Sequence, residues 1–134
     1  MIVVDTNVIC YRWIPSPHSA AADKAWAKEP VWIAPLLWRS EFRNALAGAI
    51  RRNLITAEAA IDIIEKAERQ FADREFLVSS RAVMHLIAHS NCSAYDCEFV
   101  ALARDQGVRL VTMDRQVLTE FSEVAVSLDK FVRG

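Results

Sequence analysis

The sequence predicts an α/β protein, a three-layer α/β/α sandwich around a central, mostly parallel sheet of about five strands. Short segments made almost entirely of apolar residues, such as 2–4, 31–34 and 109–113, are typical of strands buried on both faces of such a sheet. Between them, apolar residues recur with helical spacing, and strands that alternate with helices favour right-handed crossovers. The length of 134 residues, with 53% hydrophobic, suits one domain over residues 1–134.

Capping residues and prolines set the boundaries of the expected elements. Pro35 suits the first turn of a helix, Thr56 and Ser93 are good N-caps, and Gly107 suits a left-handed C-cap. In chain order we expect strand 2–4 with a helix after it, helix 18–28, strand 31–34, helix 35–53, helix 56–72, a weak strand 76–79, helix 81–89, helix 93–107, strand 109–113, a turn or short helix from 114, strand 124–127 and a tail over 128–132.

Composition and charge exclude several classes of protein. The net charge of −1 at pH 7 argues against a globally basic nucleic-acid binder, although twelve of the sixteen basic residues are Arg, which binds phosphate oxygens through a planar fork. No signal peptide and no apolar run of about 20 residues is present, so we expect a soluble, cytoplasmic protein outside the membrane. Three cysteines, Cys10, Cys92 and Cys97, predict reduced thiols.

Four carboxylates, Asp5, Glu41, Asp96 and Asp114, are the main candidates for chemistry, and each also has a local explanation. Asp5 follows the first strand, where open α/β sheets bind ligands, yet Asp is also a good N-cap. Glu41 borders the apolar stripe of its helix and could pair with an Arg at the edge of the core. Asp96 stands three residues after Ser93, the spacing of a capping box. Asp114 follows a strand and could be an ordinary turn residue.

Together the four acids predict a metal site. Two of them end strands, and the other two lie on helices expected to pack around those strand ends, so one cleft can hold all four. Two like charges about 4 Å apart repel by about 4 kcal/mol at an effective dielectric constant near 20, so such a cluster must bind protons or cations. Oxygen ligands without His or Cys select Mg²⁺ or Mn²⁺, and such ions support phosphodiester hydrolysis by activating water.

With these motifs the chain resembles the PIN-domain family, and within it the VapC-like toxins of type II toxin–antitoxin pairs. The segments that carry the resemblance are Val3-Val4-Asp5-Thr6-Asn7-Val8, Glu41 in the helix after the second strand, Ser93-Ala94-Tyr95-Asp96 leading into Phe99-Val100-Ala101-Leu102-Ala103, and Leu110-Val111-Thr112-Met113-Asp114. The resemblance implies a Mg²⁺- or Mn²⁺-dependent endoribonuclease that prefers single-stranded RNA. It also implies a homodimer held inactive by a small antitoxin, which lays a helix into a groove.

The resemblance further implies that all four acids ligate the metal, directly or through water. The other candidate residues support these carboxylates or contact RNA: Thr6 and Asn7 (orientation of a carboxylate or water), Thr112 (support of Asp114), and Arg39, Arg43 and Arg115 (RNA). Many family members carry an acid or Asn three residues after the position of Asp114, where this chain has Val117. A one-ion site, or a second ion recruited with RNA phosphate, therefore stays open.

Other readings compete with the nuclease. A PIN-like protein- or RNA-binding module with weak or lost catalysis would fit Val117, and its partner contacts would use the Trp-rich first third of the chain. His85 and His89 are one helical turn apart, but no Glu accompanies them as in a zinc-protease helix, so we expect no metal there. Asp5-Thr6-Asn7 also resembles the start of the aspartyl-phosphate hydrolases, but that family uses a second Asp as acid and base at the position of Asn7. The substitution argues against that family.

Overall fold

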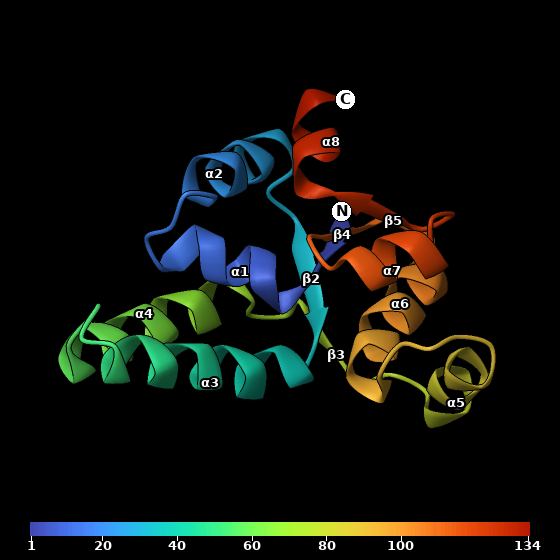
Figure 1. The fold of residues 1–134 in the computed structure, drawn as a ribbon, viewed down its shortest axis with the longest axis horizontal. Coiled ribbons are helices and arrows are strands. Elements are labelled where there is room, and N and C mark those ends of the chain that lie inside the picture. Colours follow the sequence, from blue (N-terminus) through green and yellow to red (C-terminus); the bar gives the residue numbers. More distant parts are fainter.

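The computed structural model describes residues Met1 to Gly134 and alternates strands with helices in nearly the predicted order (Figure 1). In chain order the elements are β1 (Ile2–Val4), α1 (Thr6–Trp13), α2 (Ser19–Lys28), β2 (Trp32–Pro35), α3 (Leu37–Arg51), α4 (Ala57–Gln70), β3 (Glu75–Phe76), α5 (Ser80–Ala88), α6 (Ala94–Gln106), β4 (Leu110–Thr112), α7 (Arg115–Glu120), β5 (Ala125–Ser127) and α8 (Leu128–Arg133). The predicted α/β class is confirmed.

The strands form one sheet in the order β3-β2-β1-β4-β5, and every neighbouring pair is parallel. In the middle of the sheet, Val3 of β1 lies opposite Ile33 of β2 on one side and Leu110 of β4 on the other. The chain therefore extends the sheet in one direction through β2 and β3 and in the other through β4 and β5. Where the direction reverses, between β1 and β4, parallel sheets bind ligands at the carboxyl ends of the strands.

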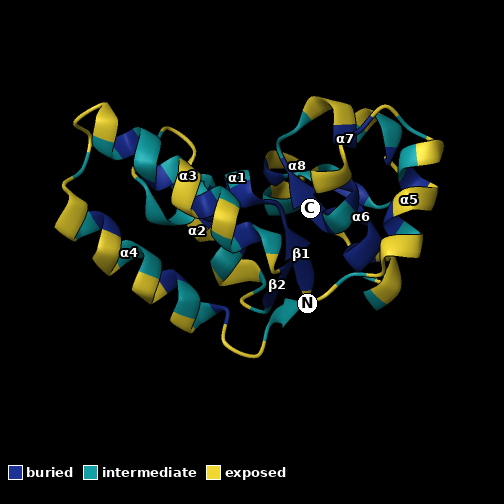
Figure 2. Ribbon diagram, turned by 90° about the horizontal axis from the view of Figure 1, so that it is seen from below, coloured by how far each residue is buried: buried dark blue, intermediate teal, exposed yellow.

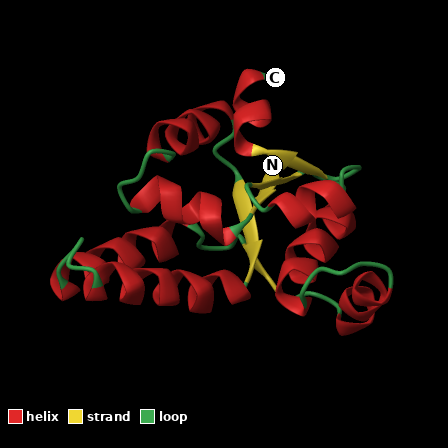
Figure 3. Cartoon of the chain, viewed as in Figure 1, coloured by secondary structure: helices red, strands yellow, loops and turns green.

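Helices cover both faces of the sheet and complete the three-layer sandwich. Figure 1 shows α1 to α4 on one side of the sheet and α5, α6 and α7 on the other. The hairpin of α3 and α4 projects from the body, and the strands between the layers are short (Figure 3). No helix is both long enough and apolar enough to cross a lipid bilayer.

One continuous apolar core of 32 buried residues joins the sheet to its helices. All residues of β1, β2 and β4 are buried, as expected of strands covered on both faces (Figure 2). Trp32 and Trp38 are fully buried in this core, whereas Trp13 and Trp26 pack at its edge. Core packing therefore accounts for two of the four tryptophans completely and for the other two in part.

Three of the expected elements differ from those in the structure. Pro35 ends β2 and does not start a helix, because it lies opposite Phe76 in the β2–β3 pair and the next N–H, of Leu36, donates to the Phe76 carbonyl. The expected tail is helix α8, since Ser127 Oγ accepts the Lys130 N–H as an N-cap and Leu128 is fully buried. The weak strand expected at 76–79 is also misplaced, because β3 spans Glu75–Phe76 and overlaps the expected range only at Phe76.

Candidate metal centre

Asp5 lies at the carboxyl end of β1 and begins α1. Its Oδ1 accepts the Thr6 N–H at 2.8 Å, so Asp5 does cap the helix. Its Oδ2 accepts the hydroxyl of Thr112, from the end of β4, at 2.7 Å. Capping of α1 explains only the hydrogen bond to Oδ1. The hydrogen bond to Oδ2 fixes the Asp5 carboxylate between the ends of β1 and β4.

Thr112 links Asp5 to Asp114. The Thr112 side chain is fully buried, and its Oγ1 accepts the Asp114 N–H at 3.0 Å while it donates to Asp5. The Asp114 carboxylate accepts the Val117 N–H at 3.0 Å and caps α7. The predicted support of Asp114 by Thr112 is therefore made through the backbone, whereas the carboxylate that Thr112 contacts belongs to Asp5.

Glu41 reaches the same region from α3. The hydroxyl of Thr6 donates to Glu41 Oε1 at 2.7 Å and thereby ties the first turn of α1 to α3. The ion pairs of the structure leave Glu41 without an Arg or Lys partner. The salt bridge that would give Glu41 a purely structural role is absent.

Asp96 and Glu98 approach from the first turns of α6. Ser93 Oγ accepts the Asp96 N–H at 3.1 Å, so the expected capping contact is present. Burial and, after it, the charge of Glu41 raise the pKa of Glu98, so this fifth acid lies close enough to Glu41 for their charges to repel. Nothing in the sequence pointed to Glu98, because residues two apart on a helix point in different directions.

Burial and mutual repulsion raise the pKa values of these acids. Burial raises the pKa of Asp5 to about 6 in spite of its hydrogen bonds, and the charges of Glu41 and Asp96 add to this effect. Burial also raises the pKa of Glu41, with a further contribution from Asp96. For Asp96, burial again comes first and the charge of Asp114 second in raising the pKa. We call Asp5, Glu41, Asp96 and Asp114 the acid centre, because their charges act on one another.

The donor set of the acid centre fits a hard divalent cation. All four side chains offer carboxylate oxygens, and no Lys or Arg neutralises any of them. As the side chains stand, no group of three or more His, Cys, Asp or Glu residues is arranged to hold an ion. The chemistry therefore suits Mg²⁺ or Mn²⁺, while the carboxylates would have to move closer together to share one.

Two further side chains of α1 border the acid centre. Asn7 carries a buried Oδ1 that accepts no hydrogen bond, so its predicted role of holding a carboxylate has no matching contact, and the oxygen remains free for a donor or cation. Burial, reinforced by the charges of Glu41 and Asp5, raises the pKa of Cys10 to about 12. Cys10 is thus a protonated thiol, and all three cysteines are free, as expected.

The three arginines predicted to contact RNA have different surroundings. Arg39 donates through Nε and Nη2 to Glu75, at 2.5 and 2.8 Å, and through Nη1 to Glu68, at 2.8 Å. Trp38 Nε1 also donates to Glu75, at 2.8 Å, and we call these four residues the Arg39 network. Because these donors are engaged, Arg39 would have to leave this network to reach a phosphate. We therefore do not include Arg39 in the proposed RNA contacts.

The other two arginines are more available. Arg43 Nη2 lies 3.9 Å from Glu68, and the Arg43 side chain is 58% exposed. Arg115 is exposed, has no ion-pair partner and directly follows Asp114 at the start of α7. Arg115 is therefore the predicted RNA contact with the best position beside the acid centre. His85 on α5 and His89, the C-cap of α5, are exposed and belong to no metal-binding group.

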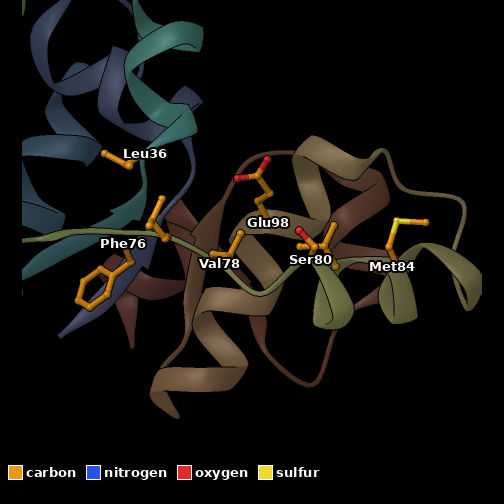
Figure 4. Close-up of a pocket in the computed structure, with 8 residues that line it drawn as sticks. Leu36, Phe76, Val78, Ser80, Met84 and Glu98 are labelled. Carbon is orange, nitrogen blue, oxygen red and sulfur yellow. The ribbon is translucent and has the colours of Figure 1, made fainter.

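An apolar hollow of about 260 Å³ adjoins the acid centre at Glu98 (Figure 4). Leu36, Phe76 and Val78 line it from the side of the sheet, and Met84 lines it from α5. Glu98 is the one charged side chain of the lining, and Figure 4 shows it between Leu36 and the α5 residues. The hollow therefore reaches the acid centre only through Glu98, whose charge acts on Glu41.

Comparison with known proteins agrees with this architecture. A family model described as PIN domain matches residues 2–126. Ribonuclease VapC3 from Pyrobaculum aerophilum is 29% identical over 126 residues, which span 90% of this chain and 94% of that protein. The crystal structure of PAE2754 from Pyrobaculum aerophilum superposes with a TM-score of 0.77 at 20% identity, covering 98% of this chain and 93% of the other.

A second solved structure shares the fold. FitAcB from Neisseria gonorrhoeae superposes with a TM-score of 0.71 at 20% identity and covers 95% of this chain and 96% of the other. At such low identity the two structures establish the fold alone. The family model, however, spans nearly the whole chain and both strand ends that carry Asp5 and Asp114. The chain therefore belongs to the PIN domain family.

Proposed function

We propose that this chain is a divalent-metal-dependent endoribonuclease that cleaves single-stranded RNA and acts as the toxin of a toxin–antitoxin pair. The observation that carries the proposal is the acid centre, whose four carboxylates act on one another without a neutralising cation. Two of them follow strands β1 and β4, at the edge where parallel sheets bind ligands, and the other two lie on helices α3 and α6. Membership of the PIN domain family and the likeness to a ribonuclease named VapC3 support the choice of reaction.

Each member of the acid centre has a role in this proposal. Asp5, Glu41, Asp96 and Asp114 would hold Mg²⁺ or Mn²⁺, which when bound supplies an activated water and neutralises the charge that develops on phosphate. Thr112 keeps the Asp5 carboxylate in place, and Thr6 does the same for Glu41. Without an ion, the raised pKa values mean that these acids hold protons more readily than exposed acids do.

Substrate and partners follow from the same family assignment. Arg115, exposed beside Asp114, is proposed to contact a phosphate of the RNA near the bond that is cleaved, and Arg43 is a second, weaker candidate. We also propose a small antitoxin as the inhibitory partner and a homodimer as the assembly, on the basis of the resemblance to VapC-like toxins.

Cleavage of a labelled pool of single-stranded RNA tests the proposal. The purified chain is incubated with Mn²⁺, Mg²⁺ or EDTA, alongside Asp96→Asn. Asp105→Asn, an exposed acid on the same helix, serves as the matched control. We expect cleavage that depends on the metal, is lost in Asp96→Asn and persists in Asp105→Asn. Equal cleavage by Asp96→Asn, or cleavage that EDTA does not affect, would refute the metal-dependent mechanism.

A binding module with weak or lost catalysis is the second candidate function. The observation in its favour is Val117, whose side chain is buried in the core where many relatives carry another acid or Asn. The carboxylates are also too far apart, as the side chains stand, to hold one ion together, which again favours a binding module over a nuclease. Expression of the chain in a bacterial host separates the two candidates: toxicity that persists after Asp5→Asn would favour binding, and toxicity that disappears favours the nuclease.

A further inference from the structure

A polar hollow lies at the end of α1 that is far from the acid centre. It has a volume of about 560 Å³ and is formed by the last turn of α1, by α2, by the last turns of α4 and by the segment that leads into β3. We call it the basic pocket, and its cations are Arg12, Lys66, Arg69 and Arg74. Arg12 lies seven residues after Asp5, about 10 Å along a helix axis, so the pocket is separate from the acid centre.

The charges of the basic pocket are only partly compensated. No Asp or Glu lines it. Arg12 pairs with Asp23 at 3.2 Å and Lys66 pairs with Asp62 at 2.9 Å, but both acids are about 60% exposed and their charges are screened by water. The Arg69 side chain makes no hydrogen bond or ion pair. The pocket therefore presents a positive potential to a ligand.

Buried hydrogen-bond donors without acceptors lie in the walls of the same pocket. Arg12 Nε, Trp13 Nε1 and Gln70 Nε2 are all buried and unpaired, and all three residues line the pocket. Buried polar groups in folded proteins nearly always have partners, so these three donors need acceptors, which either water or a ligand in the pocket can supply. An anion offers acceptors only, and rotation of the flexible Arg12 and Gln70 side chains would bring their donors to it.

Aromatic rings hold the central cation of the pocket. The Arg12 guanidinium lies 5.0 Å from the centre of the Trp13 ring and 5.8 Å from that of Trp26. Both tryptophans are only partly buried. Proteins that bind single-stranded nucleic acids combine guanidinium groups on aromatic faces with exposed rings on which a base can stack. Arg12 and the two partly exposed indoles provide this combination.

We propose that the basic pocket is a second RNA-binding site, which holds a phosphate of the substrate strand and stacks a neighbouring base against Trp13 or Trp26. The proposal rests on the proposed function, because it assumes that RNA is the substrate. The pocket would hold a part of the strand that is not being cleaved, and would thereby add affinity and length dependence without contributing to the reaction.

Binding of a labelled single-stranded RNA in EDTA tests this site without interference from cleavage. All variants carry Asp96→Asn. Lys66→Gln with Arg69→Gln removes two exposed cations of the pocket, and Arg81→Gln with Arg109→Gln removes two exposed arginines that form no ion pair and lie elsewhere. We expect the dissociation constant of the pocket variant to rise about tenfold. The slope of log affinity against log salt should fall by about 1.4, which corresponds to two lost contacts on a single strand. The control pair should change affinity less than about twofold.

The outcomes separate this site from the nuclease. Equal RNA affinity and salt slope in the pocket variant and the control overturn the second site, while metal-dependent cleavage by the unmodified chain would leave the proposed function intact. Absence of both binding and cleavage overturns both proposals. If pyrophosphate raises the melting temperature of the unmodified chain but not of the pocket variant, while RNA binding is unchanged, the site holds a small phosphate ligand and RNA is the wrong occupant.

Discussion

Helix α3 carries two clusters of charge that the protein treats in opposite ways. In the Arg39 network, the Arg39 guanidinium donates hydrogen bonds to the carboxylates of both Glu68 and Glu75. Its hydrogen bonds to Glu75 are the main reason that the pKa of Glu75 lies below its usual range. Two residues further along α3, Glu41 lies among other acids with no cation, and burial raises its pKa. The paired cluster joins α3 to α4 and β3, whereas the unpaired cluster is held at a cost that bound protons or a bound cation would remove.

The comparison teaches how to tell a structural carboxylate from a functional one in this fold. Both clusters contain partly buried acids, so burial alone does not separate them. The partner decides: an Arg makes the acid part of the framework, while a hydroxyl from Thr6 or Thr112 orients the acid without neutralising it. Substitutions in the two clusters should therefore have opposite effects on activity and stability.

The largest expected effect is the loss of activity in Asp96→Asn. Removing one of the four charges should lower RNA cleavage by about two orders of magnitude or more, because the ion loses a ligand. The fold should remain, since the Asp96 N–H that bonds to Ser93 is unchanged. Initial cleavage rates with Mn²⁺, together with circular dichroism, check both statements. Full activity in this variant would remove Asp96 from the centre.

The next largest effect should be a gain of stability in Asp5→Asn without metal. The pKa of Asp5 is about 6 in the folded chain and 3.8 in the reference state, so the folded state binds more protons between these values and stability falls as pH rises through this window. The difference corresponds to about 3 kcal/mol, and we expect Asn to recover about 2 to 3 kcal/mol at pH 8 and almost nothing at pH 4. Urea denaturation in EDTA across this range is the measurement. A loss of stability at pH 8 would contradict the raised pKa.

Thr112→Val should have a smaller effect on activity. The valine keeps the volume of the buried side chain but removes the donor to Asp5 and the acceptor for the Asp114 N–H. We expect cleavage to fall about tenfold and the Mn²⁺ concentration for half-maximal rate to rise, as for other groups that orient metal ligands. Thr112→Ser is the control, because it keeps the hydroxyl and should recover most of the rate. Failure of the serine to recover it would mean that packing and not the hydroxyl matters.

The smallest effect on activity is expected for Glu75→Gln in the Arg39 network. The substitution removes the charge that holds the Arg39 fork, and should lower the free energy of unfolding by about 1 kcal/mol because the pair is only partly buried. Cleavage should stay within about twofold of the unmodified chain. Chemical denaturation and the RNA cleavage assay report the two quantities. A large loss of activity with unchanged stability would erase the distinction between the clusters.

The fold could be predicted from local patterns, and so could the main acids. The apolar strands, the Thr56 and Ser93 caps and the Gly107 C-cap, at φ 65°, are where local spacing places them. Local patterns place Pro35 at the start of a helix, but its position at the end of β2 depends on pairing with β3, which no local pattern shows. Helix α8 is not predictable in this way, because its helix signal is only Ser127 before a six-residue segment.

The partners of the site residues were beyond the reach of local patterns. The bonds from Thr6 to Glu41 and from Thr112 to Asp5 join residues 35 and 107 positions apart, so only the folded chain reveals them. The same holds for Arg39, whose acids lie 29 and 36 positions away and remove it from the candidate RNA contacts. Residue type and strand position therefore predict which acids and arginines are candidates for the site. Tertiary contacts decide which of these side chains are neutralised by a partner.

The most direct test of the central claim is the melting temperature of the chain with and without Mn²⁺ at pH 8 and pH 5, measured on the unmodified chain, Asp5→Asn and Glu75→Gln. If the unpaired acids hold a metal, Mn²⁺ should stabilise the unmodified chain and Glu75→Gln more at pH 8 than at pH 5, where protons compete for the carboxylates, and should have little effect on Asp5→Asn. A Mn²⁺ shift that is equal at both pH values, or equally large in Asp5→Asn, would show that the acid centre is not the metal site.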